Sequence, residues 1–153
     1  MKDKIEISFY HFTTTPLVVG LPKLIKKIYY AKKNLLVLCK TEEEMNELNR
    51  VLWTFASKEF IPHGIASEAY AELQPVLFST EATRNRNDAE ILLSTCDKLE
   101  ELNLKFKKYL YAFYGNPDEV KHMMDLYSEC KAREDVEAVL WRQERSGKWS
   151  KVF

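Results

Sequence analysis

Residues 34–39, with the sequence NLLVLC, form a short and continuous apolar run near the end of the first quarter of the chain. A run of this length without alternation is typical of a strand that is covered on both faces in a parallel sheet. Thr41 follows, with Glu44 three residues later, and this spacing predicts a capping box that opens a helix over residues 41–55. A buried strand that leads directly into a capped helix restricts the chain to a layered α/β fold.

Strand-like and helix-like segments alternate through the rest of the sequence. Strands are expected at residues 5–12, 76–79, 90–94, 109–114 and 138–143, with a terminal hairpin turning at Ser146-Gly147. Two helices are expected where Thr15 and Asn116 act as N-caps, each followed by proline at the first helical position. Residues 57–74 show no sustained period and are expected to be one long excursion, while residues 95–103 are ambiguous. The pattern predicts one domain over residues 1–153, with a mostly parallel sheet and helices on both faces.

The overall charge is balanced, although its distribution is not. The chain has 23 basic and 23 acidic residues, which argues against a protein that wraps duplex DNA or lies on an anionic membrane by charge alone. Residues 1–40 and 102–153 are basic and the middle is acidic. The three cysteines are far apart, and no apolar run approaches a membrane span. The start, MKDKIEISFY, lacks a signal-peptide core, so we expect a soluble, unprocessed cytoplasmic protein without membrane contact.

Trp53 is the residue that fits its predicted helix least well. Met45, Leu48, Leu52 and Phe55 form one apolar stripe at about 100° per residue, and Trp53 falls on the polar face. Phe60, Pro62 and His63 follow in a short loop, so one region could present an indole, a phenyl ring and a rigid proline together. Two interpretations stay open, a core tryptophan folded under the loop and an anchor for a protein partner.

Motifs for catalysis or cofactor binding are not found in the sequence. The four glycines, Gly20, Gly64, Gly115 and Gly147, form no phosphate-binding loop, and the segment HFTTTP after the first strand has no glycine. The histidines at positions 11, 63 and 122 lie in separate elements, and no spacing pairs them as metal ligands. We therefore expect no catalytic residues, no cofactor and no metal, and we expect His63 to brace the loop instead of acting as a base.

Several motifs resemble one family. Leu52-Trp53 followed by Phe60-Ile61-Pro62-His63 stands behind the strand NLLVLC and a Glu-rich capped helix. Further along are AEILLS at residues 89–94, the W-x-Q of Trp141 and Gln143, and the G-K-W of residues 147–149. In order and spacing these residues resemble the chi subunit family of bacterial DNA polymerase III, over essentially the whole chain.

The resemblance implies a Rossmann-like, three-layer fold without a phosphate-binding loop, and a non-catalytic adaptor that acts in DNA replication. In that family one surface binds the psi subunit, which links chi to the clamp loader, and can also bind a helicase-like partner. DNA is then contacted only indirectly. The residues that match this surface are Trp53, Phe60 and Pro62, with Val51, Ile61 and His63 as neighbours. The alternative function is a small nucleotide-dependent α/β enzyme, which only the layered fold suggests.

The resemblance also implies a second surface, which binds the acidic C-terminal tail of single-stranded-DNA-binding protein (SSB). Here the match is poorer, because Met123, Tyr127 and Cys130 stand where better-known members have a lysine, an arginine and an aromatic residue. Ser146 falls at a threonine. Cations could come from shifted positions, since an acidic tail needs nearby charge more than one fixed geometry. The residues expected at this surface are Lys121, Tyr127, Arg133, Arg142, Ser146 and Lys148.

Overall fold

The structure, a computed structural model, describes residues 4–54, 60–81, 85–97 and 106–152, and these residues build one eight-stranded sheet. The strand order is β3-β4-β2-β5-β6-β1-β7-β8, and each neighbouring pair is parallel except the antiparallel β7–β8 hairpin. The strands are β1 (Ile5–His11), β2 (Leu35–Leu38), β3 (His63–Ile65), β4 (Val76–Ser79), β5 (Ile91–Ser94), β6 (Lys108–Phe113), β7 (Val136–Gln143) and β8 (Trp149–Val152). The mostly parallel sheet confirms the predicted α/β class.

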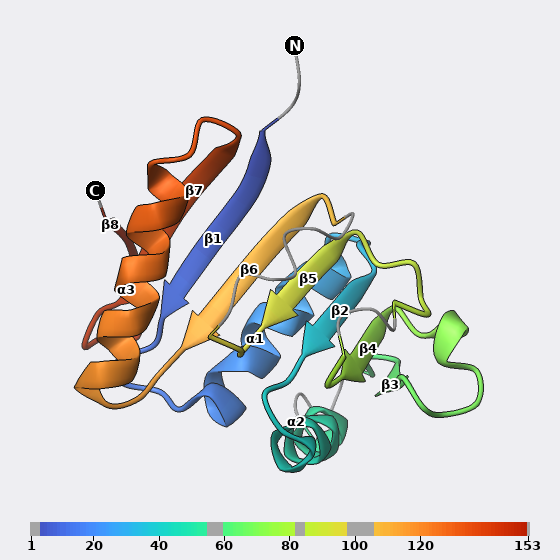
Figure 1. Cartoon of the computed structure of the whole chain (residues 1–153). Helices are drawn as coiled ribbons and strands as arrows, with labels where there is room; N and C mark the ends of the chain where they lie inside the picture. The colour runs from blue at the N-terminus through green and yellow to red at the C-terminus, as the bar shows by residue number, and fades with distance from the viewer. Residues whose placement is uncertain (1–3, 55–59, 82–84, 98–105, 153) are drawn as a thin grey trace.

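Helices cover both faces of this sheet, as the sequence predicts (Figure 1). Helices α1 (Leu17–Tyr30) and α2 (Glu42–Thr54) pack on one face, and α3 (Pro117–Lys131) packs on the other, with a short 3₁₀ helix, η1, at Ala71–Leu73. The fold is therefore three-layered and Rossmann-like. No helix in the described ranges is long and apolar enough to cross a membrane.

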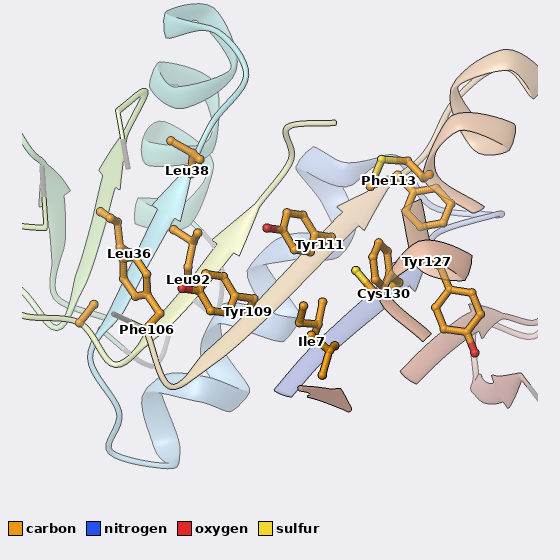
Figure 2. Close-up of a cluster of buried hydrophobic side chains, with 14 of the residues drawn as sticks. Ile7, Leu36, Leu38, Leu92, Phe106, Tyr109, Tyr111, Phe113, Tyr127 and Cys130 are labelled. Atoms are coloured by element: carbon orange, nitrogen blue, oxygen red, sulfur yellow. The ribbon is translucent and has the colours of Figure 1, made fainter. Parts of the chain in front are cut away.

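Two hydrophobic clusters, one on each side of the sheet, form the core. The α3 side is rich in aromatic rings, and Phe9 of β1 contacts Tyr111 of β6 and Tyr127 of α3 at ring-centroid distances of 5.4 and 5.6 Å. Figure 2 shows Tyr127 and Cys130 of α3 lying over the strands of this cluster. All four residues of β2 are buried, because both faces of this central strand are covered.

The starts of α2 and α3 follow the predicted capping, with one difference. The Thr41 hydroxyl accepts a hydrogen bond from the Glu44 N–H at 3.1 Å, and the Asn116 side chain accepts one from the Glu119 N–H at 2.9 Å. The Glu44 carboxylate accepts from the Lys40 N–H at 3.3 Å, so the return half of the predicted capping box is displaced by one residue.

The prediction for the start of α1 is wrong by one residue. The helix begins at Leu17, Pro16 stands at the N-cap position, and no side chain in the described part of the chain caps the helix. The reason is a tertiary contact, because the Thr15 hydroxyl accepts a hydrogen bond from Gln143 Nε2 at 2.9 Å instead of capping its own helix. A distant side chain thus overrides the local capping signal.

The expectation of one long excursion over residues 57–74 is also wrong in part. Residues His63–Ile65 form the edge strand β3, which pairs with β4, and η1 follows. Three residues are too few to show a period of two, so the strand is hidden in the sequence. Glu68 accepts a hydrogen bond from the Ile65 N–H at 2.7 Å, which covers part of the open edge. Phe55 of the predicted stripe and residues 98–103 of the ambiguous segment lie outside the described residues.

Candidate protein interface

Trp53 and Phe60 form an exposed aromatic pair beside the edge strand. Trp53 lies in the last turn of α2, Phe60 lies in the segment before β3, and their ring centroids are 5.4 Å apart. The two side chains are 54% and 64% exposed, whereas Met45, Leu48 and Leu52 on the apolar stripe of α2 are buried. The 100° periodicity thus separated Trp53 correctly from the stripe, and the indole is not a core residue.

The buried side chain of His63 packs against the inner side of this pair. The side chain is 4% exposed, and its ring centroid lies 4.3 Å from that of Trp53 and 6.0 Å from that of Phe78. Its Nδ1 is 2.7 Å from the Ile61 carbonyl oxygen and its Nε2 is 3.0 Å from the Asn49 carbonyl oxygen. Because Asn49 belongs to α2, the imidazole ties the helix to the segment that carries Phe60, which confirms a bracing role.

The other expected interface residues differ in exposure. Ile61 is buried at 2% exposure, while Pro62 and Val51 are half-buried. The six residues thus comprise two exposed rings, two half-buried neighbours and two buried supports. The two exposed rings thus rest on buried side chains. Such an arrangement suits an anchor for a protein partner, because the rings need not change conformation on binding.

The residues expected for the acidic tail lie in several places. Lys121 and Tyr127 belong to α3, Arg142 belongs to β7, and Ser146 and Lys148 lie in the β7–β8 turn. Tyr127 is a core residue at 8% exposure, with its hydroxyl 3.2 Å from Lys131 Nζ. The described contacts do not join these side chains into one cluster.

Arg133, the remaining member of that set, already has an acidic partner. Its Nε and Nη2 donate to the two Asp135 carboxylate oxygens at 2.9 and 2.7 Å. These hydrogen bonds hold the pKa of Asp135 below its ordinary value. A tail carboxylate would have to compete with this bidentate pair for the guanidinium.

The loop after β1 is where nucleotide-binding α/β proteins hold phosphate, and here a side chain fills it. The backbone N–H groups of Thr13, Thr14 and Thr15 all donate to Gln143 Oε1, at 3.2, 3.0 and 3.2 Å. The Thr13 hydroxyl donates to the Gln143 carbonyl at 2.6 Å. Gln143 therefore takes the place that an anion would need. Reasoning from residue types missed this role, although the W-x-Q motif was the available signal.

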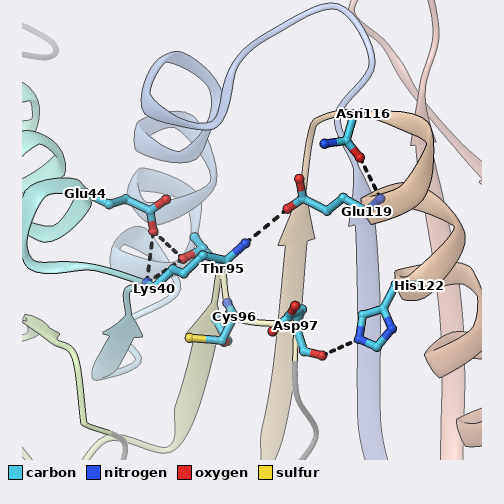
Figure 3. Close-up of polar contacts among 9 residues, drawn as sticks. Lys40, Glu44, Thr95, Cys96, Asp97, Asn116, Glu119 and His122 are labelled. Atoms are coloured by element: carbon cyan, nitrogen blue, oxygen red, sulfur yellow. Dashed lines mark hydrogen bonds and ion pairs between the residues drawn. The ribbon is translucent and has the colours of Figure 1, made fainter.

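Acidic side chains occupy the starts of α2 and α3, which lie at the same carboxyl ends of the strands as the threonine loop (Figure 3). Glu44 lies in the first turn of α2, and its carboxylate accepts hydrogen bonds from the Lys40 N–H and from the hydroxyl of Thr95, which follows β5. Glu119, at the start of α3, forms an ion pair with Lys40 Nζ at 3.3 Å. Carboxylates at both helix N-termini repel phosphate. The described residues also contain no group of three side chains that could hold a metal ion.

The fold and these contacts define a class, namely a Rossmann-like α/β protein with its phosphate positions filled by its own side chains and an aromatic pair exposed at the sheet edge. Comparison with known proteins narrows the class. The family model for "DNA polymerase III chi subunit, HolC" matches residues 5–138. The chain therefore belongs to the DNA polymerase III chi subunit family.

Two relatives show the extent of the similarity. A probable DNA polymerase III subunit chi of Rickettsia prowazekii is 29% identical over 108 residues, which cover 71% of this chain and 65% of the relative. The DNA polymerase III subunit chi of Haemophilus influenzae is 24% identical over 87 residues, covering 57% of this chain and 60% of the relative. The matched segments thus span less than two thirds of either relative's own length.

Proposed function

We propose that the chain is a non-catalytic accessory subunit of the DNA polymerase III holoenzyme. In this role it links the clamp loader, through a psi subunit, to single-stranded-DNA-binding protein, and it contacts DNA only indirectly. The surface proposed to bind psi, which contains Trp53, Phe60 and Pro62, can also engage a helicase-like protein in place of psi. The proposed protein works in the cytoplasm and needs no cofactor.

The observation that carries this proposal is the exposed pair of Trp53 and Phe60 on the buried His63. Aromatic side chains bury a large area on binding and lose few torsional degrees of freedom, so they are common anchors at interfaces. Both rings leave more than half of their surface in water, at 54% and 64% exposure, although Trp53 also packs on His63. A partner that covers both rings accounts for their exposure.

The tail contact is the less developed half of the proposal. We place it at Tyr127 and Ser146, which stand at positions of the family's tail surface, and at Lys121, Arg133, Arg142 and Lys148, which supply cations from shifted positions. The separation of these residues across α3, β7 and the β7–β8 turn argues for a contact led by charge and not by one closed pocket on α3. The filled phosphate positions at Gln143, Glu44 and Glu119 favour an adaptor over a nucleotide-dependent enzyme.

Co-purification tests the proposed assembly directly. The chain and the psi subunit from the same source would be co-expressed, purified by a tag on psi alone, and then mixed with the clamp loader. We expect chain and psi to elute as one complex that joins the clamp loader. A chain that leaves psi and the clamp loader unbound would overturn the proposed assembly. A helicase-like protein captured by the same surface would redirect it to that partner.

A further inference from the structure

A second exposed apolar pair, Tyr70 and Leu73, lies at η1, the short 3₁₀ helix between β3 and β4. Tyr70 is 68% exposed and Leu73 is 72% exposed, the highest values among the large apolar side chains in the described residues. Ala71, which lies between them, is 1% exposed and belongs to the hydrophobic cluster on the α3 side of the sheet. The pair is therefore carried by a segment that is anchored in the core.

The segment around η1 is also held by one arginine. Arg86 Nη1 donates to the carbonyl oxygens of Ala66 and Glu68, at 2.7 and 3.0 Å. Its Nη2 forms an ion pair with the Glu72 carboxylate at 3.0 Å. These contacts fix the chain on both sides of Tyr70. A surface that is already fixed loses little conformational entropy when a partner binds it.

The backbone of Tyr70 adopts a conformation that tyrosine rarely occupies. Its φ of 63° and ψ of 19° lie in the left-handed region, which favours glycine and, among other residues, asparagine and aspartate. The Leu73 N–H donates to the Tyr70 carbonyl at 3.0 Å and helps to hold this turn. Backbone conformations of this kind cluster at functional sites. An exposed aromatic ring at such a position favours a binding role over a purely structural one.

This pair lies at the same end of the sheet as the aromatic pair of Trp53 and Phe60. Strands β3 and β4 are parallel, with His63 opposite Val76. Phe60 comes three residues before His63, and Leu73 comes three residues before Val76, so both stand just ahead of the paired strands. Helix α2 packs on one face of the sheet and η1 on the other. The two pairs therefore flank the edge strand β3.

Charge indicates what kind of partner suits this edge. Residues 60–81 include three acidic side chains, Glu68, Glu72 and Glu81, and no lysine or arginine. The first turn of α2 adds Glu42, Glu43 and Glu44. Arg86 offsets part of this charge through Glu72. A complementary partner combines apolar side chains with basic ones, whereas a second copy of this edge would bring like charges together.

We propose that the partner that binds Trp53 and Phe60 also covers Tyr70 and Leu73. It passes around the β3 edge with a segment that carries apolar and basic side chains. The proposal rests on the proposed function, because it takes the psi subunit as this partner. It adds a second contact area, on the opposite face of the sheet, to the surface that contains Trp53.

Photo-crosslinking locates this contact while leaving an aromatic side chain in place. The photoreactive residue p-benzoylphenylalanine would replace Tyr70 in one full-length chain and Tyr30 in another, and each chain would be irradiated with purified psi. Tyr30 is the matched control, since it is an exposed tyrosine of α1. We expect a crosslink to psi from position 70 and none from position 30.

Affinity measures how much the second contact contributes. The double variant Tyr70→Asn with Leu73→Ser removes both apolar side chains, and asparagine suits the left-handed backbone. Its matched control is Tyr30→Asn with Val19→Ser, an exposed aromatic and an exposed aliphatic residue of α1. We expect the dissociation constant for psi to rise about tenfold in the first variant and to stay within about twofold in the control. Raising the salt concentration should weaken native binding, because it screens the acidic edge.

The possible failures of this proposal and of the proposed function give different results. Native affinity in the Tyr70 and Leu73 variant, equal weakening in both double variants, or equal crosslinking from both positions would overturn the second contact. The proposed function would stand in those cases if Trp53→Ala still weakened psi binding. Affinity that does not change with salt would overturn the basic character of the partner segment. A native chain that does not bind psi would overturn both proposals. If the double variant fails to fold, the crosslink from position 70 still decides.

Discussion

The indole of Trp53 lies with its ring centroid 4.3 Å from the imidazole of His63, so a ring that is 54% exposed stands on one that is 4% exposed. The pair connects the surface of the fold to its interior, since His63 also contacts Phe78 of β4. A partner that binds Trp53 would therefore contact a ring that is held in position by the buried His63. Rigid support of this kind lowers the conformational entropy cost of binding, because the indole is already held in place.

Replacing His63 should destabilise the whole fold. His63→Ala removes a buried ring whose two nitrogens lie within hydrogen-bond distance of the Ile61 and Asn49 carbonyl oxygens, and the lost packing and hydrogen bonding together cost about 2 to 4 kcal/mol. Urea unfolding followed by circular dichroism measures this loss. His122→Ala is the control, because His122 is exposed and its contact with the Asp97 carbonyl is a surface one. Equal stability of the two variants would contradict the bracing role.

The protein should keep more of its stability when Gln143 is replaced by a residue with a hydrogen-bond acceptor than when it is replaced by alanine. Gln143→Ala leaves three backbone N–H groups without their acceptor, and we expect a loss of about 1 to 3 kcal/mol. Gln143→Glu keeps an oxygen there with charge-assisted bonds, so it should lose less. Thermal unfolding of both variants, with Gln74→Ala as a half-buried control, tests the order. The interpretation fails if the glutamate variant is the less stable of the two.

Gly20 should not tolerate the methyl group that helices normally favour. Alanine is about 1 kcal/mol better than glycine in an open helix interior, yet a Cβ at Gly20 would lie 2.4 Å from the Phe12 ring. Because Phe12 is buried, we expect Gly20→Ala to destabilise by about 1 to 3 kcal/mol. Val19→Ala, at an exposed site on the same helix, is the control in the same unfolding assay. A stabilised Gly20→Ala protein would show that the ring moves freely.

His11 should make stability fall in mild acid. Burial, with a smaller contribution from Arg142, lowers the pKa of His11 below its ordinary value of 6.5, and its Nδ1 is buried without a hydrogen-bond partner among the described residues. The unfolded chain therefore takes up a proton first as pH falls through 6.5, so stability is lost below that pH and regained above it. Melting temperatures at pH 7.5 and 5.5 should differ more for the native chain than for His11→Gln. Identical differences would rule out this contribution.

The fold was largely predictable because its signals are local. The apolar run of β2, the Thr41 cap and the Asn116-Pro117 start of α3 each depend on neighbours within a few residues. The terminal hairpin is also present, with β7 and β8 antiparallel. The start of α1 was missed because Thr15 bonds to Gln143, which is 128 residues away. The edge strand β3 was missed because three residues carry no readable period.

The candidate site was predictable in its outer layer and not in its support. Helical periodicity alone placed Trp53 off the apolar stripe, and the structure shows it exposed. Nothing local indicates that His63 reaches the Asn49 carbonyl or that Gln143 closes the threonine loop, because both contacts join separate elements. A pocket beside α1 likewise draws its rings from separate segments, namely Tyr10 of β1, Phe12 just after β1, Trp141 of β7 and Trp149 of β8, so no single stretch of sequence contains it.

Affinity for the psi subunit is the measurement that tests the proposed interface most directly. Isothermal titration of purified psi would compare the native chain with Trp53→Ala, Phe60→Ala and Tyr30→Ala, the last being a control because Tyr30 is 54% exposed like Trp53. An anchor contributes about 2 kcal/mol or more, so we expect the dissociation constant to rise about 30-fold or more for the first two variants. Tyr30→Ala should bind within about twofold of the native chain, and all variants should keep the native circular dichroism spectrum. Native affinity in both Trp53→Ala and Phe60→Ala would contradict the account.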